Sequence, residues 1–237
     1  MTLPDGILLV DKPSGITSFR VVDRLKKRFS LRKAGHGGSL DPMATGLLVV
    51  LINRGTKQAF ALLGGDKEYL ATILMGTETD SQDITGRVTR KVDKISPGWE
   101  AIEEVLERFR GEIRQVPPMI SALKYRGERL YAIARRGEEV PRSPRTVIIS
   151  ELTMLDLSGL YLKIKIRCSK GTYIRALSHD LGRILGYGAC LTALRRTAVG
   201  PFRLADAYPL SKLLAGSREE LASRIIPIKV FTKQKLR

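Results

Sequence analysis

Short apolar runs and periodic stripes divide the first part of the chain into predicted strands and a helix. Residues 6–10 form an uninterrupted apolar run that predicts a buried strand, and residues 47–52 form another. Between these runs, apolar residues recur at helical spacing behind Thr17 or Ser18, either of which can cap a helix. The apolar stripe of this predicted helix consists of Phe19, Val22, Leu25 and Phe29.

The middle of the chain shows the same two periods. Residues 69–74 predict a strand with residues 86–92 as its partner, and a striped helix then ends at Gly111. The acidic residues at 77–83 are interpreted as a turn, because they lack the spacing of a calcium loop. Further on, two alternating segments predict a hairpin. These segments are residues 146–157 and 160–168.

Two more helices are predicted towards the C-terminal end. One is closed by Gly186 and carries Arg175 in its first turn, where a cation gains nothing from the helix dipole. An arginine at such a place indicates a specific acidic partner. The other helix begins at a capping box of Ser217 and Glu220. Together these elements predict an α+β fold with a mixed, largely antiparallel sheet flanked by helices.

Charge is the strongest global feature of the composition. The 237 residues include 41 Lys and Arg against 24 Asp and Glu, which gives a formal net charge of +17. Such an excess costs stability through self-repulsion and is typical of a polyanionic partner, nucleic acid before anionic lipid. Because only 6% of the residues are aromatic, a phosphate-gripping surface is favoured over a stacking platform for single strands. A basic surface that serves solubility alone is the alternative.

The composition and the N-terminal sequence also bear on metal binding and on the cellular location. Two cysteines and two histidines give neither a disulfide framework nor metal-ligand spacing, so we do not expect a structural zinc. The N-terminal residues lack the features of a signal peptide, and no apolar run approaches the ~18 residues of a transmembrane helix. We therefore expect a cytoplasmic protein without a membrane partner.

Residues 117–145 interrupt the regular pattern with proline and glycine. Between positions 124 and 145, seven basic residues face three acidic ones. We interpret the segment as an inserted, partly helical flap over a nucleic-acid surface, with an ordinary exposed loop as the alternative. The basic residues of the flap are Lys124, Arg126, Arg129, Arg135, Arg136, Arg142 and Arg145.

Residues 35–46 are the strongest candidate for chemistry. This loop holds four glycines, His36 and Asp41 within twelve residues, and Pro42 fixes the backbone directly after the carboxylate. A carboxylate held in this way has a fixed position, which indicates a role in chemistry. A glycine-rich turn with a solvated aspartate, leading into the strand at 47–52, is the alternative.

The loop and several further motifs resemble the signature of the TruB family, the bacterial tRNA pseudouridine-55 synthases. The motifs follow the family order across residues 3 to about 210. The family usually has threonine where this chain has Gly37 and Ser39, and commonly tyrosine where it has Ile120. These departures touch the rigidity of the loop and one neighbouring contact, but not the nucleophile. Besides residues 35–46, the matching motifs are residues 11–18, 67–69, 76–86, 115–124, 129–131 with 134–137, 169–175 and 194–197.

The resemblance implies that the chain isomerises the uridine at position 55 in the T-loop of tRNA, by detaching the base, rotating it and rejoining it through carbon, without metal or cofactor. It implies Asp41 as the nucleophile, Arg175 as the guanidinium that keeps this carboxylate ionised, and Tyr69 as a ring packed on the target base. Flipping the base out costs a few kcal/mol, which basic contacts to phosphates offset. By the same resemblance, His36 helps to hold the flipped conformation, Tyr173 and Leu194 line the pocket, and Lys12 supports the loop from below. The paired arginines Arg195 and Arg196 suit phosphates, and the candidate contacts from the flap are Arg126, Arg129, Arg135 and Arg136.

We expect one catalytic domain over residues 1–237, with the flap at about 117–145 and a basic extension at about 211–237. Many relatives continue into a small C-terminal RNA-binding domain of the PUA type, for which this chain leaves no room. The expected partner is tRNA through its T-arm, with no obligatory protein partner and a monomeric state. Two alternatives stay open: a pseudouridine synthase for another RNA, and a non-catalytic tRNA-binding or folding module.

Overall fold

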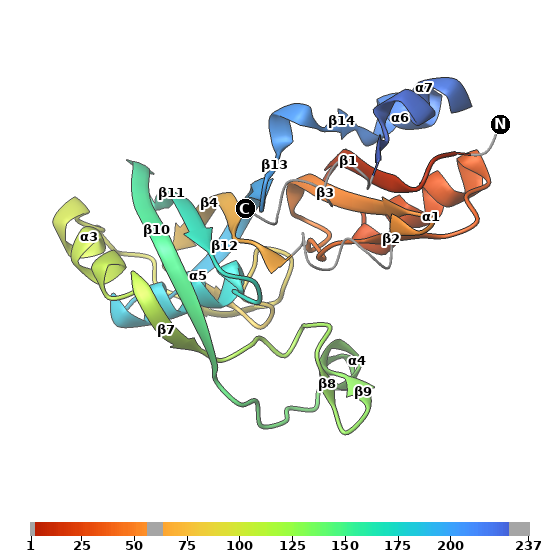
Figure 1. Ribbon diagram of the computed structural model, residues 1–237. Coiled ribbons are helices and arrows are strands. Elements are labelled where there is room, and N and C mark those ends of the chain that lie inside the picture. Colours follow the sequence, from red (N-terminus) through yellow and green to blue (C-terminus); the bar gives the residue numbers. More distant parts are fainter. Residues whose placement is uncertain (1–2, 56–63, 228–237) are drawn as a thin grey trace. The chain divides into compact units, whose positions relative to one another are not determined.

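The computed structural model describes residues 3–55 and 64–227, and the chain divides into two compact units (Figure 1). Unit 1 comprises residues 1–69 and 195–237, and unit 2 comprises residues 70–194. Unit 2 is therefore an insertion in the sequence of unit 1. The chain passes between the units within two strands, β4 (Lys67–Met75) and β12 (Ala189–Val199). The single catalytic domain expected from the sequence stays a prediction.

Unit 1 contains a mixed sheet built around one long antiparallel pair. β1 pairs with β3 along its whole length, from Gly6 opposite Ile52 to Lys12 opposite Gly46. β2 and β15 add antiparallel neighbours, whereas β14 and residues 195–196 of β12 pair in parallel. The strands are β1 (Gly6–Lys12), β2 (Ala34–His36), β3 (Thr45–Ile52), β13 (Phe202–Arg203), β14 (Tyr208–Pro209) and β15 (Ile226–Pro227).

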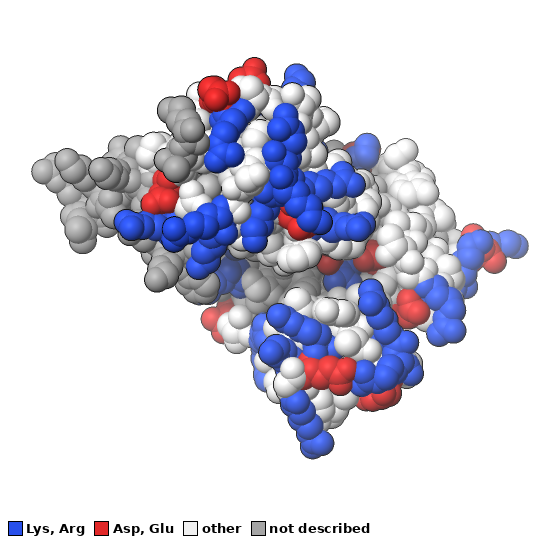
Figure 2. Space-filling model, turned by 90° about the vertical axis from the view of Figure 1, so that its right-hand side faces the viewer, with Lys and Arg blue, Asp and Glu red and all other residues white. Residues whose placement is uncertain are grey.

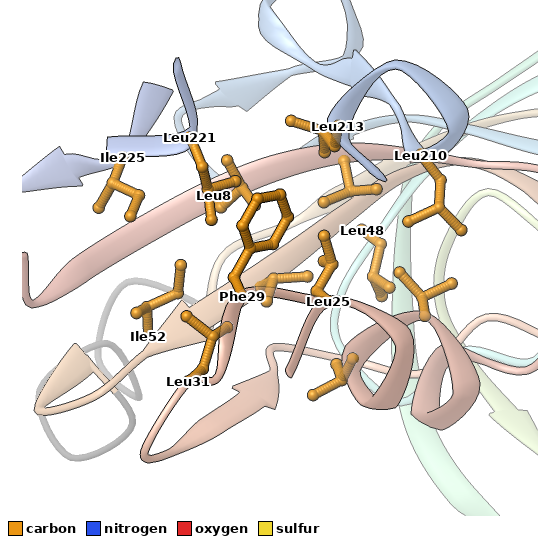
Figure 3. Packing of buried hydrophobic residues seen from close by; sticks show 14 of the residues in the cluster. Leu8, Leu25, Phe29, Leu31, Leu48, Ile52, Leu210, Leu213, Leu221 and Ile225 are labelled. Carbon is orange, nitrogen blue, oxygen red and sulfur yellow. The ribbon is translucent and has the colours of Figure 1, made fainter. Parts of the chain in front are cut away.

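Both faces of the β1–β3 pair are buried, which explains why the sequence of each strand is apolar without alternation. One face packs against three helices, and Figure 3 shows how their side chains meet those of the strands. On the other face, Val199 and Phe202 pack against the odd-numbered residues of both strands. The helices of unit 1 are α1 (Ser18–Phe29), α6 (Leu210–Ala215) and α7 (Arg218–Arg224), with a 3-10 turn η2 (Leu204–Asp206).

Two of these helices begin at side-chain caps, and one apolar residue of α1 lies outside the buried face. Thr17 caps α1, since its side chain accepts the N–H of Arg20 at 3.1 Å, and Ser217 forms the predicted capping box of α7. The prediction that Phe19 is buried was wrong, because Phe19 is 72% exposed. Val21 takes its place on the buried face, and Phe19 lies about 100° around the helix from the centre of that face.

Unit 2 contains strands in the order β12, β4, β11, β10 and β7, with helices beside the sheet. β10 and β11 form the predicted antiparallel hairpin. The sheet is thus mixed, largely antiparallel and flanked by helices, as the sequence predicts. The further elements of unit 2 are β5 (Thr77–Thr79), β6 (Val88–Lys91), α3 (Trp99–Glu107), β7 (Gly111–Gln115), β8 (Lys124–Tyr125), β9 (Glu128–Arg129), α4 (Leu130–Arg135), β10 (Arg145–Ser158), β11 (Tyr161–Cys168) and α5 (Ile174–Ile184).

Two predicted details of unit 2 were wrong. The segment at 86–92 does not pair with β4, because β6 pairs with β5, its near neighbour in sequence, in a separate two-stranded sheet. The predicted helix does not continue to Gly111 either. α3 ends at Glu107, and Gly111 begins β7 with a φ of +83°.

The segment at 117–145 is partly helical, as the flap interpretation requires. It contains β8, β9 and α4, which extend away from the sheet of unit 2 in Figure 1. Arg142 ties the two ends of the segment together, because it donates to the Pro117 carbonyl at 3.1 Å.

Basic side chains are frequent on the surface of the protein. Lys and Arg outnumber Asp and Glu on the face shown in Figure 2. Of the helices in residues 3–55 and 64–227, none combines the length and the apolar character needed to cross a membrane. The predicted basic extension forms α6, α7 and β15 up to Pro227, and its basic tail at 229–237 lies outside the described residues.

Candidate active site

The loop that carries Asp41 lies in unit 1, between β2 and β3. Six consecutive carbonyl groups, from Gly38 to Met43, each accept a hydrogen bond. A loop with its carbonyls bonded in this way keeps one backbone path without regular secondary structure. The donors are Arg196 for Gly38 and Ser39, Ser18 for Leu40, Ala44 for Asp41, Lys12 and Gly15 for Pro42, and Ser14 for Met43.

Several of these donors come from the motif at residues 11–18. Ser18 bonds both backbone groups of Leu40, accepting the N–H at 2.8 Å and donating to the carbonyl at 3.3 Å. The N–H of Gly15 donates to the Pro42 carbonyl at 2.8 Å. The two motifs that the sequence analysis matched separately therefore form one structure, with Asp41 half-buried at its centre.

Lys12 is fully buried beneath this loop. Its Nζ donates to the carbonyls of Pro13, Ile16 and Pro42 at 2.9, 2.7 and 3.2 Å. These contacts fit the expected role of Lys12 as a support of the loop. Burial lowers the pKa of Lys12 from 10.5 to about 8, although the nearby charge of Asp41 works in the opposite direction.

The lowered pKa of Lys12 predicts a pH-dependent stability. The folded protein gives up this proton at lower pH than the unfolded chain, so burying the charge costs stability below about pH 8, and that cost is lost as the pH rises to 10.5. Compared with Lys12→Met, the parent should therefore gain free energy of unfolding across this window. Urea titrations of both proteins below, within and above the window measure the difference. A difference that is constant with pH would contradict the prediction.

Arg196 is the second buried support of the loop. Its backbone lies opposite Gly46 in the parallel pairing of β12 with β3. Its guanidinium donates to Leu47 after the loop at 2.8 Å, and to Gly38 and Ser39 before Asp41 at 3.1 and 3.4 Å. The sequence analysis took Arg196 for a phosphate ligand. Because the residue is 1% exposed, these contacts identify it instead as a clamp that joins the two ends of the loop.

The contact between Gly46 and Arg196 leaves no room for a side chain. A Cβ on Gly46 would lie 2.3 Å from the carbonyl oxygen of Arg196, so Gly46→Ala must push β3 and β12 apart. We expect a loss of about 1–3 kcal/mol in the free energy of unfolding beyond that of Gly127→Ala. Gly127 is a matched control, since it also has a positive φ but has open space around it. Equal losses in chemical denaturation would contradict this account.

His36 on β2 and Arg195 on β12 are two further candidates of unit 1. Burial, and then the charge of Arg196, lower the pKa of His36, so the neutral imidazole dominates at neutral pH. Its buried Nδ1 has no hydrogen-bond partner within the described residues. Arg195 donates to the carboxylate of Asp11 at 2.8 Å and to Thr45 Oγ1 at 3.3 Å. Its use for phosphates stays a prediction.

In unit 2, Arg175 has the acidic partner that its place in the helix predicts. Its Nε lies 3.6 Å from the carboxylate of Asp83, and both side chains are buried. The guanidinium also donates to the carbonyls of Ser81 and Ile120, each at 2.8 Å. The sequence analysis interpreted the stretch with Asp83 only as a turn. An ion pair between Arg175 and Asp41 would join residues of the two units and stays a prediction.

Three further candidate residues, Tyr69, Leu194 and Tyr173, lie on strands or next to a helix. Tyr69 is buried on β4 and Leu194 is buried on β12. Tyr173 stands directly before α5, and buried Gln115 bonds both of its backbone groups, accepting at 2.7 Å and donating at 3.0 Å. Sequence reasoning did not single out Gln115, although this residue opens the matching motif at 115–124.

The flap arginines differ in how far they are engaged. Arg136 binds the carboxylates of Glu128 and Glu138, with Nε 2.6 Å from Glu138. Arg126 and Arg135 lie over the rings of neighbouring tyrosines at 5.4 and 5.5 Å. Arg129 donates to the carbonyl of Ala122. These contacts hold the four guanidinium groups against other residues of the flap. Contact of these arginines with RNA stays a prediction.

Family models match the chain in two consecutive parts. Residues 26–174 match the TruB family pseudouridylate synthase (N terminal domain). Residues 175–230 match the tRNA pseudouridylate synthase B C-terminal domain. The first match includes the Asp41 loop and ends one residue before Arg175.

Curated relatives are similar over most of the chain. The tRNA pseudouridine synthase B of Bordetella avium is 49% identical over 213 residues, which cover 89% of this chain and 87% of the relative. The protein of the same name from Francisella philomiragia is 46% identical over 225 residues, which cover 94% of this chain and 74% of the relative.

Solved structures share the fold. A chain of a Cbf5–Nop10–Gar1 complex matches with a TM-score of 0.75 and 31% identity, over 95% of this chain and 61% of that one. A chain of an H/ACA RNP bound to a substrate RNA containing 2′-deoxyuridine matches with a TM-score of 0.70 and 30% identity, over 94% and 59%. The chain thus spans about three-fifths of these structural neighbours.

Proposed function

Since the chain belongs to the TruB family of pseudouridylate synthases, we propose that it isomerises uridine to pseudouridine at position 55 in the T-loop of tRNA. The observation that carries the proposal is the bonded loop around Asp41. Its carbonyls accept hydrogen bonds from residues of unit 1 before and after Asp41, which fixes the backbone of the proposed nucleophile. Such preorganisation is what a nucleophile requires before substrate arrives.

In the proposed reaction, Asp41 is the nucleophile. Its carboxylate forms a temporary bond to the nucleotide, and the N1–C1′ bond between base and ribose breaks. The base rotates, a ring carbon forms the new bond to C1′, and the bond to Asp41 is released. The ring carbon loses its proton and N1 gains one, so the product is an isomer of the substrate. Tyr69 packs on the target base, and Arg175 provides the positive charge beside the carboxylate. Lys12 and Arg196 take no part in bond making, because all their described contacts are with the protein backbone.

The target base has to leave the T-loop before it can react. We propose that the neutral ring of His36 helps to hold the flipped conformation, while Tyr173 and Leu194 line the base pocket. The flap arginines and the charge of +17 attract the phosphates of the T-arm and offset the cost of flipping. The proposed partner is tRNA alone, bound by a monomer in the cytoplasm.

The experiment that tests this function is pseudouridine mapping. Unmodified tRNA is incubated with the purified protein and each uridine is then examined. We expect conversion at position 55 and at no other position. Conversion at a different uridine, or no conversion at all, would contradict the proposal.

One rival is favoured by a specific observation, namely the likeness to chains from a Cbf5–Nop10–Gar1 complex and from an H/ACA RNP bound to a substrate RNA. An enzyme of that kind would act on another RNA. A minimal T-arm stem-loop separates the two functions, because it should suffice as a substrate for the proposed enzyme. Product on ribosomal RNA together with no product on the stem-loop would favour the rival.

A further inference from the structure

The exposed face of α1 carries basic residues to which the proposed reaction assigns no role. The helix has five basic residues and one acidic residue, and it faces the viewer in Figure 2, where Lys and Arg side chains gather. α3 shows a different arrangement, because there Arg108 and Arg110 bind glutamates of the helix. A surface that only serves solubility mixes both signs in the manner of α3.

The cations of α1 are not equally engaged. Lys27 lies 3.0 Å from the carboxylate of Asp23, and Arg28 donates to the carbonyls of Leu214 and Gly216. Within residues 3–55 and 64–227, the guanidinium groups of Arg20 and Arg24 form no hydrogen bond or ion pair. They are four residues apart on one helix face, where like charges repel. We call these two residues the arginine pair.

A cavity of about 350 Å³ lies beside the arginine pair, and Arg24 lines it. Lys12, Arg195, Asp11 and Ser211 contribute to its walls, so three cations face one carboxylate. Lys12 and Arg195 already donate to carbonyl groups and to Asp11. The three cations therefore give the cavity a positive electrostatic potential. The guanidinium of Arg24 is also a hydrogen-bond donor that no described residue uses.

We propose that the arginine pair and this cavity bind backbone phosphates of RNA, outside the loop that receives the target uridine. The proposal rests on the proposed function, which supplies RNA as the ligand. Both parts belong to unit 1, and Lys12 connects them, because it lines the cavity and donates to Pro42 next to Asp41. An RNA strand that places its base at Asp41 thus has phosphates within reach of the cavity.

The packing of α1 favours RNA over a lipid surface. A helix that lies on a membrane needs a free apolar face. The apolar face of α1 is buried in the core of unit 1, through Val21, Val22, Leu25 and Phe29, and only Phe19 is exposed. What α1 offers to a partner is therefore charge with guanidinium donors, which suits phosphodiester oxygens.

The test compares two substitutions that remove one charge each from the same helix. Arg24→Gln removes a proposed phosphate contact, whereas Lys27→Gln is the matched control, because Asp23 already compensates its charge. Binding is measured on a T-arm stem-loop with cytidine at the target position, so that no turnover occurs. For Arg24→Gln we expect about tenfold weaker binding and a slope of log K against log salt that is smaller by about 0.7–0.9. For Lys27→Gln we expect binding within about twofold of the parent.

Several outcomes would overturn the proposal. Equal weakening by both substitutions would mean a diffuse charge effect without a site. Unchanged RNA binding by Arg24→Gln would also overturn the proposal. Two further probes, inorganic phosphate and vesicles of equal parts phosphatidylglycerol and phosphatidylcholine, then show whether the site binds a free phosphate or a lipid headgroup instead. The proposal fails whether the variant loses binding to one of these probes or to neither. Equal melting temperatures of the three proteins confirm that the fold is intact. Product formation by the parent on the uridine stem-loop is measured separately, and its absence would contradict the proposed function instead.

Discussion

Asp41→Asn should abolish pseudouridine formation while the protein still binds tRNA. The asparagine has the size of the aspartate, and the loop is held through its carbonyl groups, so the backbone path should remain. Without an ionised oxygen there is no nucleophile, and we expect product formation to fall by more than about 10⁴-fold, the scale of removing a nucleophile in other enzymes. Single-turnover assays with unmodified tRNA measure the rate, and filter binding measures the affinity.

The control for this experiment is Asp156→Asn. Asp156 is an exposed carboxylate on β10 that pairs with Lys163, so the same chemical change there should leave the rate as it is. Product at the parental rate from Asp41→Asn would remove Asp41 from the mechanism. Loss of both product and tRNA binding would mean that the substitution damages the loop, and the assignment of a nucleophile would then lack support.

The second large effect is expected at Arg175. Removing this guanidinium with Arg175→Met leaves Asp83 buried without its cation, and the carbonyls of Ser81 and Ile120 lose a donor. We expect a loss of about 3 kcal/mol in the free energy of unfolding, measured by urea titration. Product formation should fall as well, because the proposed mechanism places this charge beside Asp41.

A second substitution separates charge from packing at this site. Asp83→Asn removes the carboxylate charge but can still accept from Ser81 and Thr85, which bond Asp83 at 2.9 and 2.5 Å. In the double variant with Arg175→Met, it should therefore recover part of the lost stability without restoring activity. Additive losses would show that Arg175 and Asp83 do not depend on each other.

Patterns between near neighbours in the sequence were enough to predict much of the fold. A strand buried on both faces is apolar throughout, which is why β1 and β3 could be identified from residues 6–10 and 47–52. The capping box at Ser217 and the β10–β11 hairpin depend on residues close in sequence as well. Phe19 failed as a prediction because helical spacing alone did not exclude a position at the side of the buried face.

Contacts between distant residues were beyond such patterns. Arg196 clamps Leu47 across 149 positions, and no local motif distinguishes a buried clamp from an arginine that awaits a phosphate. Asp83 likewise lies among acidic residues with nothing to mark it as the partner of Arg175. The family resemblance indicated which residues matter, but their contacts became visible only once the fold placed the strands.

The order of the two units along the chain has a consequence for synthesis on the ribosome. Unit 2 is continuous from residue 70 to 194, whereas unit 1 needs residues from both ends. Because domains fold as units while the chain emerges, unit 2 can form first, and the Asp41 loop waits for Arg196 to arrive before its clamp is complete. A nascent chain that ends before Arg196 would lack this clamp, so we expect it to be inactive.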